Sequence, residues 1–336
     1  MTGPSLGWAL YSAESRPSFQ RMLHLARMPV LLLLLAASAC GDAPPGESSR
    51  SPQPGGEPDT LPQAPRWSYE RSLVFVSNTG DSLLVVPWVL EATTVPGGVA
   101  RAARGWLARN GAWEAFMRDE WNSAPNQEPW RILPHGPLRI LVGEGDRLDR
   151  IFYAGGGRRL EVSLDETLVE WTGNQGGAFN VVEGGLVLGD RRVPGRVLDV
   201  SQGIRVQEGS LGDWIFLTSG DSLALLAQAP RYQEEDMSYQ GWALDGAQEL
   251  GWPELSVEWE EQRAYEPARR DIPSILTLRS PASDLEAELQ VLSFQLEVRA
   301  GPGPVLPVDG VMELAGMLRI GGRELPVQGI LRHRQP

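Results

Sequence analysis

The chain has 336 residues and a formal net charge of −13, and its basic residues are all arginine because it contains no lysine. The acidic balance argues against nucleic-acid binding, since phosphate backbones are bound by basic faces. The absence of lysine excludes Schiff-base chemistry and a P-loop, because both depend on a lysine amine.

Residues 1–40 have the parts of a secretory signal peptide. Arg16, Arg21 and Arg27 precede an apolar run over residues 29–37, and small residues then lead into Cys40. A run of about ten residues is too short for a transmembrane helix, which needs roughly 20, but it suits a signal peptide. The pattern therefore predicts export.

The segment Ala37-Ser38-Ala39-Cys40 resembles the bacterial lipobox, in which the cysteine is lipidated and becomes the new N-terminus. An ordinary signal peptide cleaved nearby, or a short uncleaved anchor, is the alternative. We expect a lipoprotein of the cell envelope, anchored in a membrane through fatty-acylated Cys40 and facing the periplasm or the exterior. Gly41 stands where aspartate signals inner-membrane retention in some bacteria, so we expect the outer membrane.

Cysteine and histidine are scarce. Cys40 is the only cysteine, and only His135 and His333 follow the signal peptide. No internal disulfide can form, and a zinc site would need more histidine or cysteine than remains. We predict no metal site and no cofactor.

A tether follows over residues 41–66, where prolines alternate with glycine, serine and acidic residues. Such a segment has little apolar surface to bury, so we expect it to stay extended and disordered. We infer that it holds the folded body away from the membrane.

Short alternating stretches separated by glycine and aspartate make up most of the body. Examples are residues 72–77, 159–163 and 289–298. Alternation with a period of two places one face in a core and the other in solvent, as in an antiparallel sheet. The sequence therefore predicts an all-β fold, either a sandwich or a barrel.

Two patterns recur in the same order along the body. Residues 75–83 return at 216–223 around a Gly-Asp-Ser-Leu segment, and residues 188–194 return at 320–326 around a glycine turn. Both offsets are similar, and turn dipeptides between apolar strands are typical of hairpins. We predict two related β domains, over residues 67–205 and 211–336.

One segment departs from the alternation. Within residues 97–121, apolar side chains including Trp106, Trp113, Met117 and Trp121 recur at spacings of three, four and seven. This spacing predicts one or two amphipathic helices inserted in the first domain, packed on the end of the barrel or forming a lid over a pocket.

The Gly-Asp-Ser-Leu segments at 80–83 and 220–223 have the letters that name a family of serine esterases. A nucleophilic serine needs a base oriented by a third group, and neither His135 nor His333 has an aspartate three residues before it. Turn chemistry explains both segments better than catalysis does.

The segment from Gly189 to Gly203, the following Gly212-Asp213-Trp214 strand start and the final hairpin at 316–331 resemble the carotenoid 1,2-hydratase family. This family is also described as hydroxyneurosporene synthase-like or AttH-like. The resemblance is closest over residues 180–336 and implies two tandem lipocalin-like antiparallel β-barrel domains.

The family places an Asp-His pair at the end of its first domain, where this chain has Asp199-Val200. The histidine is therefore missing. The resemblance implies that Asp199 would be the general acid of a hydratase, because hydrating an alkene needs a positioned proton donor and a buried carboxylic acid can supply one. A turn or strand-end role for Asp199 is the alternative.

Our leading hypothesis is an exported lipoprotein that binds an apolar or amphiphilic small molecule, such as a lipid or isoprenoid, in or between the domains. Trp214, Tyr239 and Trp242 are the candidate ligand-binding residues, with core packing as the alternative. The second hypothesis is a hydratase-like lyase acting on an isoprenoid or lipid alkene, and the third is a non-catalytic envelope scaffold.

Overall fold

The computed structural model describes residues 65–77, 83–125, 127–131, 135–143, 147–173, 175–233 and 238–336. Cys40, the signal peptide, most of the predicted tether and residues 80–82 of the first Gly-Asp-Ser-Leu segment lie outside these ranges. Residues 61–336 belong to one compact unit. In the part of the chain that the structure describes, no helix is long and apolar enough to cross a membrane.

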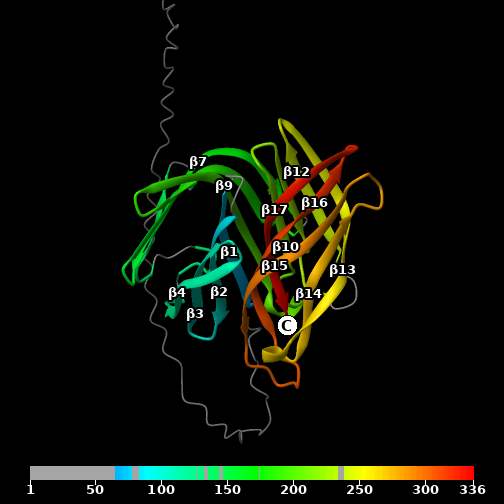
Figure 1. The fold of residues 1–336 in the computed structure, drawn as a ribbon. Helices are drawn as coiled ribbons and strands as arrows, with labels where there is room; N and C mark the ends of the chain where they lie inside the picture. The colour runs from blue at the N-terminus through cyan, green and yellow to red at the C-terminus, as the bar shows by residue number, and fades with distance from the viewer. Residues whose placement is uncertain are drawn as a thin grey trace, which may run out of the picture. The chain divides into compact units, whose positions relative to one another are not determined.

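The first half of the body is a nine-stranded antiparallel sheet (Figure 1). Its strands follow the order β4-β3-β2-β1-β9-β8-β7-β6-β5, so that β1 pairs with β9 in the middle. The strands are β1 (Trp67–Ser77), β2 (Leu84–Val95), β3 (Gly98–Arg109), β4 (Ala112–Ser123), β5 (Leu138–Val142), β6 (Leu148–Gly155), β7 (Arg158–Thr172), β8 (Ala178–Leu188) and β9 (Arg191–Arg205).

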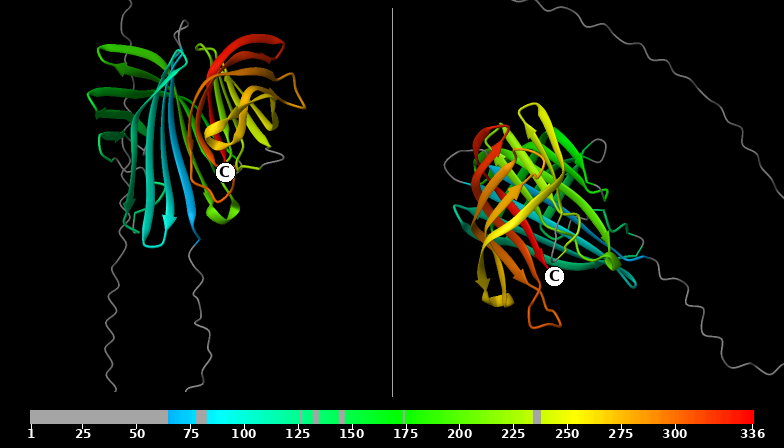
Figure 2. Two further views of the ribbon diagram at one scale, coloured as in Figure 1. Left: turned by 60° about the horizontal axis from the view of Figure 1, so that its bottom comes forward. Right: turned by 90° about the vertical axis from the view of Figure 1, so that its right-hand side faces the viewer.

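The second half is a closed eight-stranded antiparallel barrel, drawn from yellow-green to red in Figure 2. Consecutive strands pair with one another, and β10 pairs with β17 to close it. The strands are β10 (Trp214–Ser219), β11 (Leu223–Gln228), β12 (Tyr239–Asp245), β13 (Gln248–Tyr265), β14 (Arg270–Arg279), β15 (Glu286–Val298), β16 (Val308–Ile320) and β17 (Arg323–Gln335). Two single-turn 3₁₀ helices, Val206–Glu208 and Glu266–Ala268, join strands.

The predicted helical insertion at 97–121 is wrong, because these residues form the hairpin of β3 and β4. Asn110 and Gly111 make its turn with φ values of 50° and 81°, the pairing favoured by a tight hairpin. A β-bulge at Gly105 and Trp106 interrupts the period of two. The bulge and burial on both faces of β3 produce the helix-like spacing.

The two halves repeat the same pairing. The recurring residues 75–83 and 216–223 belong to the β1–β2 and β10–β11 hairpins. The second pair of recurring segments belongs to the β8–β9 and β16–β17 hairpins, which close each half against its first strand. The predicted all-β tandem architecture is confirmed, except that the first sheet is open between β4 and β5.

Three apolar cores hold the body together. The barrel interior is one, and the inner face of the curled nine-stranded sheet is another. The third lies between the sheet and the barrel, where Val74 and Leu198 of the sheet pack with Phe216 and Ile330 of the barrel. This shared core joins the two halves and covers one face of the open sheet. The other, inner face forms a trough.

Candidate functional site

The trough is the inner face of the nine-stranded sheet. Side chains of β4 and β6 meet across it although their backbones do not pair: the Tyr153 hydroxyl donates to the Phe116 carbonyl at 2.6 Å, and the two rings lie 4.9 Å apart. Leu73, Trp88 and Leu160 fill its middle. The trough is therefore accessible at its two ends, one at the hairpin turns and one where β1 begins.

The hairpin end holds an open cavity of about 820 Å³. Its apolar lining consists of Leu84, Leu107, Leu188 and Val193, from β2, β3, β8 and β9, with half-buried Trp113 on one side. A space of this size can take the body of a lipid-sized molecule, and apolar lining with a few polar groups is typical of small-molecule sites.

The rim of this cavity is cationic. Arg158 pairs with Glu114, whereas Arg109 and Arg191 make no ion pair with the described residues. Their charges favour a ligand with an anionic group, because a guanidinium binds carboxylate and phosphate oxygens well. The cavity thus combines an apolar floor with a positively charged edge.

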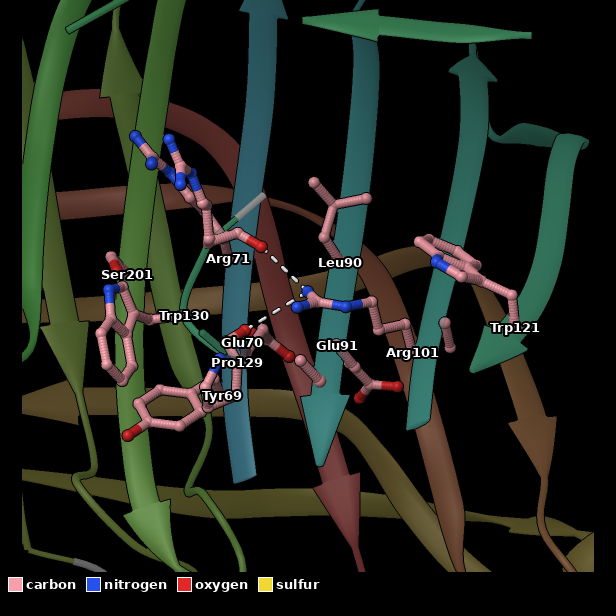
Figure 3. A pocket seen from close by; sticks show the side chains of 13 residues that line it. Tyr69, Glu70, Arg71, Leu90, Glu91, Arg101, Trp121, Pro129, Trp130 and Ser201 are labelled. Carbon is pink, nitrogen blue, oxygen red and sulfur yellow. Dashed lines mark hydrogen bonds between the residues drawn. The ribbon is translucent and has the colours of Figure 1, made fainter. Parts of the chain in front are cut away.

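The opposite end, which we call the mouth, is shown in Figure 3. Arg101 is buried there. Its guanidinium donates to the backbone carbonyls of Glu128 at 2.9 Å and Arg131 at 2.9 Å, and its Nε donates to Ser123 Oγ at 2.8 Å. It makes no ion pair among the described residues, and burial lowers its pKa. Arg101 therefore fixes the β4–β5 loop on the mouth.

Aromatic rings surround the mouth. Tyr69 stacks on Trp67 with centroids 5.8 Å apart and meets the edge of Trp130 at 6.0 Å. Trp130 is 56% exposed, on the loop that Arg101 holds. Trp121, on β4, lies parallel to the His135 ring with centroids 4.2 Å apart.

His135 also contacts Asp119, with 2.6 Å between Nδ1 and Oδ2. Because Nδ1 is engaged, Nε2 is the ring nitrogen that remains for a hydrogen bond with a bound molecule. Sequence reasoning missed this pair because sixteen residues separate its members. The scarcity of histidine was the one available signal, since His135 is one of two after the predicted signal peptide.

Asp199, the candidate acid, lies on β9 and is 5% exposed. It faces the trough, since Leu198 and Val200 on either side point to the core shared with the barrel. Arg71 donates to both of its carboxylate oxygens, at 2.8 and 2.6 Å. This two-point pair engages both oxygens of the carboxylate.

The three predicted ligand-binding residues do not share one pocket. Trp214 and Trp242 belong to the core between the sheet and the barrel, where Trp242 packs against Trp171 and Phe179. Tyr239 lies inside the barrel, and burial, with a smaller effect of Asp213, raises its pKa well above the ordinary value. The structure thus places none of the three in the trough.

A buried charge cluster lies between the sheet and the barrel. Arg332 is fully buried, with Glu70 at 3.2 Å and Asp309 also paired to it, and Arg334 pairs with the same Glu70. Its other members are Glu91, Glu297, Arg104 and Arg299. Four carboxylates meet these four guanidiniums, exposed Arg118 also pairs with Glu297, and the cluster connects the two halves through ion pairs.

In the described ranges, no group of three or more histidine, cysteine, aspartate or glutamate side chains is arranged to hold a metal ion. The side chains of the trough offer an apolar cavity at one end, with two arginines that pair with no described residue, and aromatic rings, a buried cation and a His–Asp pair at the other.

The fold defines a class of protein: a tandem of two antiparallel β units, in which a closed barrel accompanies an open sheet. No family model and no curated protein matches the sequence. A solved structure described as AttH from Nitrosomonas europaea aligns with a TM-score of 0.54 at 12% identity, over 80% of this chain and 92% of that one.

Kievitone hydratase from Nectria haematococca aligns with a TM-score of 0.49, and CghA in complex with Sch210972 with one of 0.45, both at 11% identity. Each alignment covers 79% of this chain and 87% of the other protein. The similarity to the AttH structure confirms, at the level of the fold, the resemblance drawn from the sequence.

Proposed function

We propose that the protein is an exported lipoprotein that binds an amphiphilic small molecule, with an apolar body and an anionic group, in the trough of its open sheet. The single observation that carries this proposal is the 820 Å³ cavity at the hairpin end, apolar on its floor and cationic on its rim. Burial of an apolar ligand body there would supply most of the affinity, and the arginines would orient its charged group.

The comparison between the two halves supports the trough rather than the barrel. Twenty-five buried apolar residues pack within the barrel, whose strands close completely. The nine-stranded sheet does not close, so a ligand can enter it without breaking backbone hydrogen bonds. The closed barrel would thus be a structural unit, and the open sheet, built on the same strand pairing, would be the unit that binds the ligand.

The test is to isolate the protein from a lipid extract and identify bound molecules by mass spectrometry, then to titrate it with cis-parinaric acid, a fluorescent fatty acid. We expect Leu107→Arg, which places a long charged side chain in the cavity, to weaken binding at least about tenfold, equivalent to about 1.4 kcal/mol. Met317→Arg on the barrel exterior is the matched control and should bind normally. Recovery of no lipid and no binding of cis-parinaric acid would favour an envelope scaffold, and equal binding by both variants would place the ligand outside this cavity.

A second candidate function is a hydratase-like lyase acting on an isoprenoid or lipid alkene, with Asp199 as its acid. The observation that favours it is the position of Asp199 on the trough face of β9. Since Arg71 engages both oxygens of the carboxylate, contact between Asp199 and an alkene would require this pair to open. Hydration activity that survives Asp199→Asn would exclude this assignment.

A further inference from the structure

The exposed tryptophan at the mouth needs a physical explanation. Trp130 is the most exposed large apolar side chain among the described residues, at 56%. Arg101 fixes the carbonyls of Glu128 and Arg131 on either side of it. Buried Arg101 therefore fixes the backbone on both sides of Trp130, and the Trp130 ring stays exposed in a defined position.

Trp130 does not stand alone. Tyr69 joins it to Trp67, and the Arg205 guanidinium lies over the Trp67 ring at 5.4 Å. Exposed Val206 follows at the end of β9. Tryptophan and tyrosine with nearby arginine are the residues that anchor proteins at the headgroup level of a bilayer, because their rings are apolar and their tips polar.

The position of this surface, close in the chain to Cys40, favours a lipid bilayer as its partner. The folded body begins at Trp67, and only 26 residues, 41–66, separate it from Cys40. Twenty-six residues span at most roughly 90 Å even when fully extended. A lipid at Cys40 would thus keep the aromatic surface at a high effective concentration beside the bilayer.

In place of the expectation that the tether holds the body away from the membrane, we propose that the surface formed by Trp67, Tyr69, Trp130, Arg205 and Val206 rests on the phospholipid bilayer, so that the mouth of the trough opens toward it. This inference rests on the proposed lipid anchorage and deepens the proposed function. The 820 Å³ cavity then lies at the end of the trough that points away from the bilayer.

The single cysteine allows a direct test. The chain beginning at Cys40 can be coupled through that thiol to a maleimide lipid in phosphatidylcholine vesicles, because it contains no other cysteine. Residues 61–336 form one compact unit, so the coupled chain keeps its folded body. Tryptophan fluorescence is then compared between vesicles with brominated and ordinary acyl chains, since bromine quenches rings that enter the bilayer. We expect quenching in the wild-type protein.

Trp130→Phe should remove part of this quenching, and Trp67→Phe with Trp130→Phe should remove most of it. Trp252→Phe is the matched control on the barrel, because Trp252 is half-buried like Trp67 but lies outside the proposed surface. Trp130→Glu should also reduce quenching of the remaining rings, whereas Met317→Glu should not.

Wild-type protein without quenching, or quenching that both Trp→Phe variants leave intact, would overturn the proposal. Binding of cis-parinaric acid by the wild-type protein without vesicles is measured separately. Its failure would remove the proposed ligand function while leaving the membrane contact to be judged by the quenching alone.

Discussion

At the scale of single residues, Glu70 shows how the charge cluster works. Burial alone would raise the pKa of Glu70, but Arg334 and Arg332 outweigh burial and lower it to about 2. The neighbouring Asp309 is affected in the same direction, since Arg332 and Arg299 outweigh its burial and lower its pKa. The folded state therefore holds these carboxylates ionised.

This shift predicts how stability depends on pH. Because the folded pKa of Glu70 lies below its ordinary value of 4.5, its contribution is complete above that pH and is lost as pH falls from 4.5 toward 2. The shift corresponds to about 3 kcal/mol. Glu70→Gln should flatten the fall in the free energy of unfolding over this window, measured by urea denaturation at several pH values.

The same substitution should destabilise the protein at neutral pH by about 3–5 kcal/mol, because it leaves buried guanidiniums without their partner. Asp165→Asn is the control, since the pair of Asp165 with Arg192 is half-exposed. We expect it to change stability by less than about 1 kcal/mol. Equal effects of the two substitutions would contradict the role given to the cluster.

At the scale of elements, the β3–β4 hairpin shows what the sequence can and cannot predict. The strands around residues 72–77 and 159–163 were recognisable from alternation, whereas Trp106, Trp113 and Trp121 suggested a helix. Both faces of β3 are buried, one in the trough and one against the barrel. A strand buried on two sides loses the alternation on which strand prediction depends.

The candidate site was less predictable than the fold. Asp199 was found through family resemblance, but its partner Arg71 lies 128 positions away and meets it only because β1 pairs with β9. The pair of His135 with Asp119 likewise depends on a loop that Arg101 folds back. Contacts of this kind follow from sheet order, which residue spacing does not determine.

The turn of the β3–β4 hairpin gives a prediction about backbone strain. Gly111 has φ of 81° with open space around it, so Gly111→Ala would cost only backbone strain. We expect a loss of about 1–2 kcal/mol in the free energy of unfolding. Asn110→Gly should be close to neutral, because glycine adopts the positive φ of that position readily. A stable Gly111→Ala protein would show that the turn adjusts.

At the scale of the whole molecule, the core between the sheet and the barrel determines how they unfold. Trp214 is fully buried in that core although it belongs to the barrel. Its neighbours there include Val74 and Val200 of the sheet. Each half has its own core, but both contribute to the shared one, and we expect them to unfold together.

Trp214→Ala should lower the free energy of unfolding by about 3–5 kcal/mol while retaining a single transition. Far-UV circular dichroism and tryptophan fluorescence should report the same urea midpoint in the wild type and in the variant. Trp252→Ala, at a half-buried position, should cost less. Two separate midpoints would show that the halves fold independently.

The pairing of the first strand of each half with its last has a consequence for biosynthesis. β1 cannot complete its pairing until β9, more than a hundred residues later, has been synthesised, and β10 likewise depends on β17. β17 also contains Arg332 and Arg334, the partners of Glu70. Long sequence separation slows folding because distant segments must first find one another. While the ribosome is still working, the nascent polypeptide would thus expose unsatisfied strand edges, a state that suits threading through a translocation channel and demands protection by chaperones until synthesis is finished.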